Sequence, residues 1–181
     1  ASLSVGADFT PGSFTANQST LTLTGATAAN VSGLSFYNLV INKAAQANTV
    51  SSTGGLTVTN SLTMTRGTWV AGGGAYTHSI AGAWNSSAGV FTFTAGSCTI
   101  QLSSATPNIT TKGIGTDPFT LLTLSNGGSL QTDAQATSNL SITAGALALN
   151  GHALSVGGNL TGAGLTASGS EAISVGGDCN L

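Results

Sequence analysis

Residues 140–156 read LSITAGALALNGHALSV, and three short apolar segments recur in this stretch at a fixed interval. Leu140, Leu147 and Leu154 lie seven positions apart, and each is followed by a small residue and then by a second apolar residue. This alternation is typical of a β-strand that buries one face. The intervening residues include Gly and Asn, which tolerate the backbone angles of tight corners. Three such sides predict a chain wound into coils of about 21 residues.

The same alternation occurs throughout the chain, in LTLT (21–24), LTV (56–58), LTM (62–64) and FTFT (91–94). No stretch shows convincing helical periodicity. Strands of three or four residues separated by equally short corners are too short for a conventional antiparallel meander. The sequence therefore predicts an all-β protein, a right-handed parallel β-helix (β-solenoid) of short strands with about 20 residues per coil.

A longer repeat overlies this rhythm. A phrase of five residues begins with an apolar residue, has small residues at its second and third positions, and ends with a bulky or apolar residue. Its four copies are Val5–Phe9, Ile80–Trp84, Val156–Leu160 and Val175–Cys179. The closing position is expected to face the core. We interpret residues 1–181 as a single domain with repeats of about 75 residues, namely 4–78, 79–154 and a partial third at 155–181.

The composition limits the function. Only 4% of residues are charged and the net charge is −2, so the chain lacks the basic stripe that nucleic acid requires. No run of about 20 apolar residues is present, so membrane insertion is not expected. A hydrophobic content of 40% argues against disorder. Low charge suits a secreted protein packed among copies of itself, and the N-terminal Ala in place of Met suggests signal-peptide removal.

The phrases LTVTNSLTM (56–64) and GALALNGHALSVGGNL (145–160) resemble the Ser/Thr/Gly-rich β-helix repeats of bacterial surface proteins. Filamentous adhesins and autotransporter passengers are the familiar examples. The resemblance covers nearly the whole chain, but it lies in composition and rhythm and includes no catalytic signature. It implies a right-handed parallel β-helix at the cell surface or outside the cell, as a stalk, adhesin or fibre.

No catalytic residue, cofactor or metal site is expected. Polysaccharide hydrolases need carboxylates about 5–10 Å apart. Asp117 and Asp133 are less than one coil apart in the sequence and are flanked by different residues, so they are not expected to form such a pair. A metal needs converging ligands, and no acid accompanies His78 or His152 in the sequence. Both histidines are expected at solvated corners. A polysaccharide-active enzyme is accordingly the least favoured interpretation.

The two cysteines are predicted to lie far apart. Cys98 and Cys179 are close to four coils apart, or about 19 Å at the usual strand spacing, which is too far for a disulfide. Either both are free, or each forms an intersubunit disulfide with another chain. Among the aromatic residues, Trp69 and Tyr76 remain candidates for stacking on surface glycans.

The same phrase occurs near both ends of the chain, at Val5–Phe9 and at Val175–Cys179, and this repetition suggests a function. A solenoid without caps exposes strand edges that a second copy can extend. We expect the chain to be a subunit of an extracellular filament, a homopolymer that grows head-to-tail, and we expect its end-to-end interface to contain Leu3, Val5, Phe9, Ile173, Val175 and Cys179. The alternative is a carbohydrate- or host-binding adhesin module of a larger protein, whose gene would continue with further repeats. A β-sandwich pilin completed by a donated strand is a second alternative for the fold.

Overall fold

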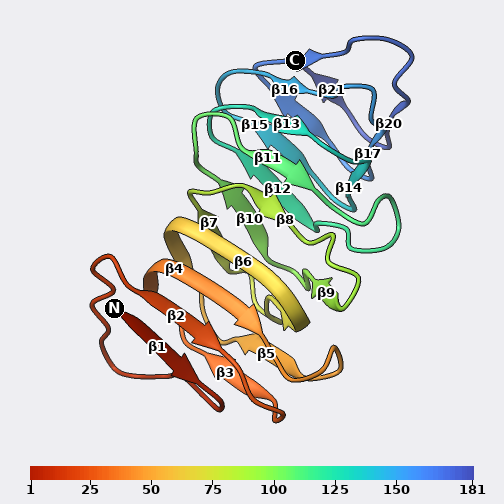
Figure 1. The fold of residues 1–181 in the computed structure, drawn as a ribbon. Coiled ribbons are helices and arrows are strands. Elements are labelled where there is room, and N and C mark those ends of the chain that lie inside the picture. The colour runs from red at the N-terminus through yellow and green to blue at the C-terminus, as the bar shows by residue number, and fades with distance from the viewer.

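The computed structural model describes residues 1–181 and consists of 21 β-strands with no helix. The strands form a parallel β-solenoid of about nine turns, with about 20 residues per coil. The coils stack along one axis, and the two termini lie at opposite ends of the stack (Figure 1). The prediction of an all-β solenoid is therefore confirmed, whereas its right-handed sense stays a prediction.

One sheet runs the whole length of the stack, and we call its main path the long ladder. In order along the ladder the strands are β1 (Ser2–Val5), β2 (Thr20–Leu23), β4 (Ser35–Asn42), β6 (Thr57–Val70), β7 (Thr77–Ile80), β10 (Thr99–Leu102), β12 (Leu121–Leu124), β15 (Leu140–Ile142), β18 (Leu160–Gly162) and β21 (Cys179–Asn180). Every neighbouring pair is parallel. A branch of the same sheet contains β3 (Ala29–Val31), β5 (Thr49–Ser52) and β9 (Phe91–Thr94).

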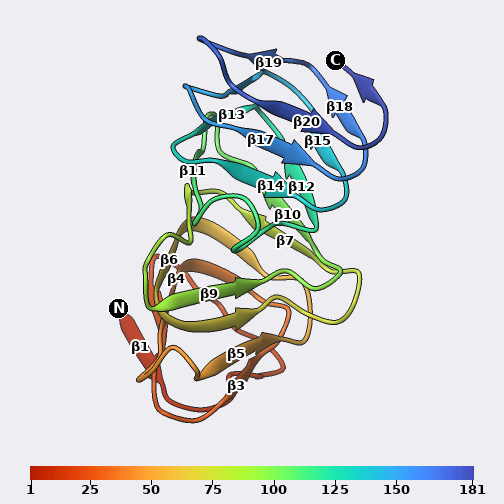
Figure 2. The ribbon, with the colours of Figure 1, turned by 90° about the vertical axis from the view of Figure 1, so that its right-hand side faces the viewer.

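The C-terminal half adds two further sheets and is three-sided (Figure 2). The five-stranded sheet contains β8 (Trp84–Asn85), β11 (Asn108–Thr110), β13 (Gly128–Leu130), β16 (Leu147–Ala148) and β19 (Leu165–Thr166). The three-stranded sheet contains β14 (Ala134–Ala136), β17 (Leu154–Val156) and β20 (Ile173–Val175). Leu140, Leu147 and Leu154 begin one strand on each of the three sheets, and all three are buried. The seven-residue interval therefore marks the three sides, as predicted.

The N-terminal half departs from the prediction of uniformly short strands. Strand β4 has eight residues and β6 has 14. The segment Thr57–Arg66 contains no Gly and no Pro, so nothing in it ends the strand. β6 therefore continues over a span where the next coil forms three separate strands, β7, β8 and β9. Gly67, with φ of +119°, follows directly and lies at the point where β6 leaves the long ladder and joins β5 and β9.

The core is a single cluster of 35 buried apolar residues. Its centre is an aromatic column of Trp69, Trp84, Phe93 and Phe119, in which the Trp84 ring centroid lies 4.8 Å from that of Phe93 and 4.9 Å from that of Phe119. The column occupies the coils where the N-terminal half meets the three-sided half. Trp69 is fully buried within it, so the prediction that Trp69 could stack on glycans is wrong.

The repeated phrase marks corners, but not the same corner each time. Val5 and Ile80 end strands of the long ladder, whereas Val156 and Val175 end strands of the three-stranded sheet. The phrase thus encodes a strand, a tight corner and the next strand, at whichever side of the coil it occurs. Consequently the first and last phrases lie on different sides, and the two ends are not copies of one surface. The closing position faces inward, since Trp84 and Leu160 are fully buried.

Candidate functional site

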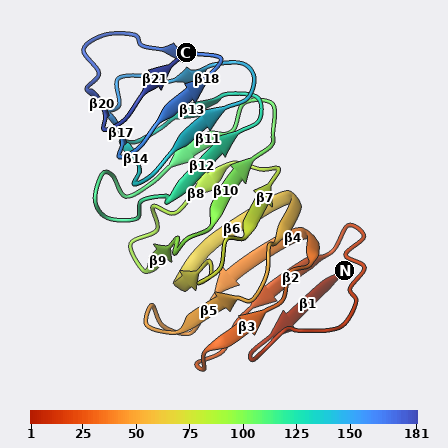
Figure 3. The ribbon, with the colours of Figure 1, turned by 180° about the vertical axis from the view of Figure 1, so that it is seen from behind.

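The terminal coils hold the residues predicted to form the end-to-end interface. Strand β1 pairs only with β2, β20 only with β17, and β21 only with β18 (Figure 3). Leu3 is 43% exposed and Ile173 is 45% exposed, and both lie on these terminal strands. Val5, Val175 and Phe9 are half-buried, and the Phe9 ring contacts Phe14 and Phe36. Each end therefore presents an unpaired strand edge beside partly uncovered apolar side chains.

The two cysteines differ sharply in access. Both are free; Cys98 is fully buried and Cys179 is exposed. Burial raises the pKa of the Cys98 thiol to about 11. Four steps of the long ladder separate β10, which follows Cys98 directly, from β21, which contains Cys179. The predicted separation is consistent with this placement, and only Cys179 is accessible to another molecule.

A ladder of side-chain amides supports one corner of the three-sided half. Asn139 Oδ1 accepts the backbone N–H of Asn159 at 2.8 Å, and Asn159 Oδ1 accepts the N–H of Asp178 at 2.9 Å. The glycines that precede these residues make room for the bonds. A Cβ on Gly158 would lie 2.3 Å from Asn139 Oδ1, and one on Gly177 would lie 2.2 Å from Asn159 Oδ1. Within the stack, each coil that covers this corner places a glycine there.

A polar hollow opens on the side of the three-sided half. Its volume is about 560 Å³, and no apolar side chain lines it; the lining residues are Ser87, Thr111, Lys112, Gly113, Thr132, Asp133 and His152. In a chain with three basic and five acidic residues, the hollow brings together one base, one acid and one histidine. His152 Nδ1 lies 3.7 Å from Asp133 Oδ1, which also accepts the Ala153 N–H at 2.8 Å. The expectation that no acid accompanies His152 is therefore wrong.

A buried polar network lies beneath this hollow. Asp117 is buried; it accepts a hydrogen bond from Ser86 Oγ and, at 2.8 Å, from the backbone N–H of Lys112. Trp84 Nε1 donates to the same Ser86 oxygen at 3.2 Å. Burial raises the pKa of the Asp117 carboxyl, and the hydrogen bonds from Ser86 and Lys112 oppose that rise. The network fixes the segment that carries Lys112 against the aromatic column.

His78 is buried in the core, so the prediction of a solvated corner is wrong. Its Nδ1 accepts the Leu56 N–H at 3.0 Å, so its Nε2 carries the proton and donates to Ala71 O at 2.6 Å. Burial lowers the pKa of His78, and the hydrogen bond to Ala71 acts in the opposite direction. The ring stacks edge-on to Trp69, with centroids 5.3 Å apart. The neutral ring thus satisfies two buried backbone groups.

Two further charged residues have structural partners that the sequence did not indicate. Lys43 is buried, and its Nζ donates to the carbonyl oxygens of Thr24 and Gly6 rather than to an acid. Burial lowers the pKa of Lys43. Glu171 is held by backbone donors, because its carboxylate accepts the N–H groups of Ser168 and Gly151 at 2.7 and 2.9 Å. These bonds lower the pKa of Glu171 to about 2.

No three of the His, Cys, Asp and Glu side chains come together as a group that could hold a metal ion. The structure holds no helix long and apolar enough to cross a lipid bilayer. Comparisons of the chain with models of known protein families, with curated proteins and with solved structures found no match.

Proposed function

We propose that the chain is the repeating subunit of an extracellular filament in which solenoids stack end to end as a homopolymer. The observation that carries the proposal is the pair of unpaired parallel edges, β1 at one end and β20 with β21 at the other. Backbone N–H and C=O groups on such edges pair readily with another strand. A contact between two different ends propagates into an open filament. The near-absence of charge removes the repulsion that would keep copies apart.

Two stacking registers are conceivable, and continuity of the long ladder favours one of them. If the repeated phrases were matched, Ala7 of one copy would lie on Gly177 of the next. The Ala7 Cβ would then meet the Asp178 side chain, just as a Cβ on Gly177 would meet Asn159 Oδ1 at 2.2 Å. If the long ladder simply continues, β1 lies on β21, and Ala1 meets the same corner in the same way. The ladder register extends the one sheet that runs the whole length of the stack, and we therefore infer that Leu3 of one copy lies beside Cys179 of its neighbour.

This register also bears on the predicted intersubunit disulfide. A head-to-tail contact places Cys179 against the first coil, which contains no cysteine, and Cys98 is buried. Subunits within one filament would then be held by backbone hydrogen bonds and apolar contact alone. Cys179 stays available as a partner for an engineered thiol.

The test is to purify the 181-residue chain, concentrate it under mild conditions, and examine it by electron microscopy and sedimentation. Filaments whose subunit rise equals about nine strand spacings, or about 43 Å, are expected. The variant Leu3→Cys should oxidise with native Cys179 into a ladder of covalent oligomers, because adjacent strands bring Cα atoms within disulfide range. Phe9→Cys, which tests the phrase-matched register, should not. A monodisperse monomer at high concentration contradicts the proposal.

A carbohydrate- or host-binding adhesin module is the second candidate, and the polar hollow favours it. Hydroxyl, carboxylate and ammonium groups converge there without apolar lining, and such groups can hydrogen-bond the hydroxyls of a surface glycan. The expected result is saturable binding of a glycan from a defined panel, with loss of binding in Lys112→Ala and Asp133→Asn. Binding without filaments would favour the adhesin over the subunit.

A further inference from the structure

Six tripeptides of the chain have the form Asn, any residue except Pro, then Ser or Thr, which is the acceptor motif of N-linked glycosylation. Their asparagines are Asn17, Asn30, Asn85, Asn108, Asn139 and Asn159. A chain rich in Ser and Thr contains such motifs by chance, so the motif alone identifies no site. The structure separates the six by three criteria: a free amide nitrogen, a hydroxyl held beside the amide, and room for a sugar.

Three of these asparagines hold adjacent coils together through their side chains. Asn139 and Asn159 form the ladder of side-chain amides at one corner of the three-sided half. Asn30 Nδ2 donates to Asp8 Oδ1 at 3.3 Å. Each of the three amides lies against an adjacent coil, which leaves it unsuited to carry a sugar.

Two further motifs lack the required geometry. Asn108–Thr110 is the whole of β11, which pairs with β8 on one side and β13 on the other, so the motif is held extended within a sheet. Asn17 is exposed in the first coil, but the hydroxyl two residues later, on Ser19, donates to Ala16 O and not to Asn17. In neither motif does the hydroxyl bond the asparagine amide.

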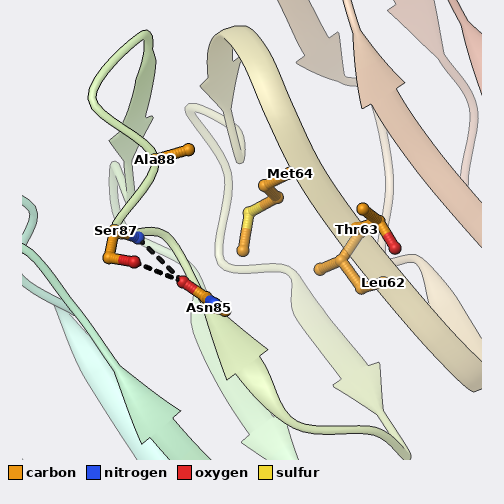
Figure 4. Close-up of a pocket in the computed structure, with 6 residues that line it drawn as sticks. All are labelled: Leu62, Thr63, Met64, Asn85, Ser87 and Ala88. Carbon is orange, nitrogen blue, oxygen red and sulfur yellow. Dashed lines mark hydrogen bonds between the residues drawn. The ribbon is translucent and has the colours of Figure 1, made fainter. Parts of the chain in front are cut away.

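Asn85 differs from the other five asparagines. It ends β8, is exposed, and is followed by Ser86 and Ser87. The N–H and Oγ of Ser87 donate to Asn85 Oδ1 at 3.1 and 2.7 Å, which forms a turn closed by the asparagine side chain (Figure 4). The turn places the hydroxyl of the motif beside the amide and fixes the amide by its oxygen. Asn85 Nδ2, the atom to which a sugar is attached, forms no hydrogen bond.

The motif is anchored from beneath by its middle residue. Ser86 is fully buried, and its Oγ donates to Asp117 and accepts from Trp84 Nε1. Ser86 thus faces the core while Asn85 and Ser87 are exposed, in keeping with the alternation of an extended chain. The folded chain therefore presents the acceptor motif in a fixed conformation at its surface.

Room for a first sugar lies beside the motif, between β6 and β8. The coil that contains β8 lies one strand spacing above β6 at two points, where Ala81 N–H donates to Val58 O at 2.8 Å and Gly67 N–H donates to Val90 O at 3.1 Å. Between these points no ladder joins β6 to β8, and a hollow of about 290 Å³ opens at the surface. Its lining residues are Leu62, Thr63 and Met64 on β6, and Asn85, Ser87 and Ala88 on the opposite segment (Figure 4).

The size and lining of the hollow suit one sugar ring. A cavity of about 150 Å³ accommodates a benzene ring, so a hollow of about 290 Å³ has room for one pyranose. Leu62 and Met64 offer apolar surface to the C–H groups of the ring, and the Thr63 hydroxyl can bond a sugar hydroxyl. A sugar on Asn85 would cover this gap in the stack.

We propose that Asn85 is an N-glycosylation site whose sugar donor is a glycosyl diphosphate, carried by a lipid or by a nucleotide. In the transfer, the bond between the sugar C1 and a diphosphate oxygen breaks, and a bond between C1 and Asn85 Nδ2 forms. The diphosphate leaves with the electron pair, and the Nδ2 proton passes to a base of the transferase. The proposal is independent of the filament, since β8 lies in the middle coils and neither end of the stack takes part.

The test is transfer in vitro to the purified, folded full chain, followed by mass spectrometry of the intact protein and its peptides. One arm supplies a lipid-linked oligosaccharyl diphosphate with a membrane oligosaccharyltransferase, and the other supplies UDP-glucose with a soluble N-glucosyltransferase; an unrelated acceptor peptide shows that both enzymes are active. A single glycan at Asn85 is expected, and the arm that reacts identifies the donor. Modification of Asn17 or Asn108 ahead of Asn85, or no transfer to Asn85 in either arm, overturns the proposal.

Three variants separate the site from the bare motif. Asn85→Gln should abolish transfer, and Ser87→Thr, which keeps the hydroxyl, should retain it. Ala88→Leu keeps the motif but fills the hollow, and it should slow transfer about tenfold, equivalent to about 1.4 kcal/mol of lost sugar contact. The melting temperature of each variant shows that the solenoid is intact. Undiminished transfer to Ala88→Leu, in a folded protein, would show that the hollow does not receive the sugar and would refute its part in the site.

Discussion

The buried histidine makes the stability of the middle coils depend on pH. His78 is neutral in the fold, because its Nδ1 must accept the Leu56 N–H while its Nε2–H donates to Ala71 O. A second proton on Nδ1 would turn two donors toward each other in the core. Burial accordingly holds the pKa of His78 below its ordinary value of 6.5. A histidine with a depressed pKa contributes stability above the unfolded value of 6.5, and this contribution is lost as the pH falls toward the folded pKa.

The size of the effect follows from linkage. Below pH 6.5 the unfolded chain takes up one proton at this position that the folded chain excludes. Each pH unit within that window therefore removes about 1.4 kcal/mol from the free energy of unfolding. His78→Asn keeps an acceptor for the Leu56 N–H but leaves Ala71 O without its donor, at an expense of about 1–3 kcal/mol at pH 7. The difference between wild type and variant should then shrink by about 1.4 kcal/mol per pH unit.

The assay is urea unfolding of both proteins at half-unit steps between pH 7.5 and 5.0. Other titrating groups act equally on both proteins and cancel in the difference. His78→Gln is the matched control, since it keeps the donor to Ala71 and loses the acceptor, yet it also cannot titrate. Both variants should converge on wild type at low pH. Parallel curves for wild type and His78→Asn would show that His78 does not exclude the proton and would refute this reasoning.

Three further predictions concern the corners, one acid and the thiols. Gly157→Ala places a Cβ 2.2 Å from the carbonyl oxygen of the coil below and should destabilise the fold by about 1–3 kcal/mol in urea unfolding, whereas Gly89→Ala, with no heavy atom within 4 Å, should change it by less than about 0.5 kcal/mol. Because backbone donors lower the pKa of Glu171 to about 2, its contribution to stability is complete above pH 4.5 and is lost as the pH falls from 4.5 to 2; an NMR titration midpoint near 4.5 would contradict this. In the native protein a thiol reagent should modify Cys179 rapidly, while Cys98, buried and with a pKa raised to about 11, should react only on unfolding; rapid reaction of two thiols would be the contrary result.

Much of the coil was predictable because its signal is local. The alternation around Leu140, Leu147 and Leu154 fixes which side chains face inward, and the Gly and Asn residues between them fix the corners. Three residues per strand and four per corner leave little choice of side length. The long β6 strand was also within reach of this reasoning, since Thr57–Arg66 lacks the Gly and Pro that end the other strands.

The predictions for His78 and Trp69 were wrong because they followed the type of each residue and not its position in the strand. His78 lies two residues before Ile80, so the alternation that places Ile80 inward places His78 inward as well. Trp69 alternates with Gly67 and Ala71, which are both buried. Position in the strand, rather than polarity or size, decided each case, because a solenoid core can satisfy a ring nitrogen with the backbone of a neighbouring coil.

The polar hollow was only partly predictable. Asp133 and His152 lie about one coil apart in the sequence, and that spacing indicates neighbours in adjacent coils. The bond between Ser86 and Asp117 has no such signal, because 31 residues separate them and the loop that carries Asp117 folds back beneath the hollow.

The aromatic column determines what an optical experiment on this protein can detect. Both tryptophans of the chain, Trp69 and Trp84, belong to it, with centroids 6.0 Å apart. Intrinsic emission therefore reports on the middle coils, where Trp84 lies on β8. Loosening or joining of the terminal coils would leave this emission unchanged, so a filament and its free subunit should share one spectrum.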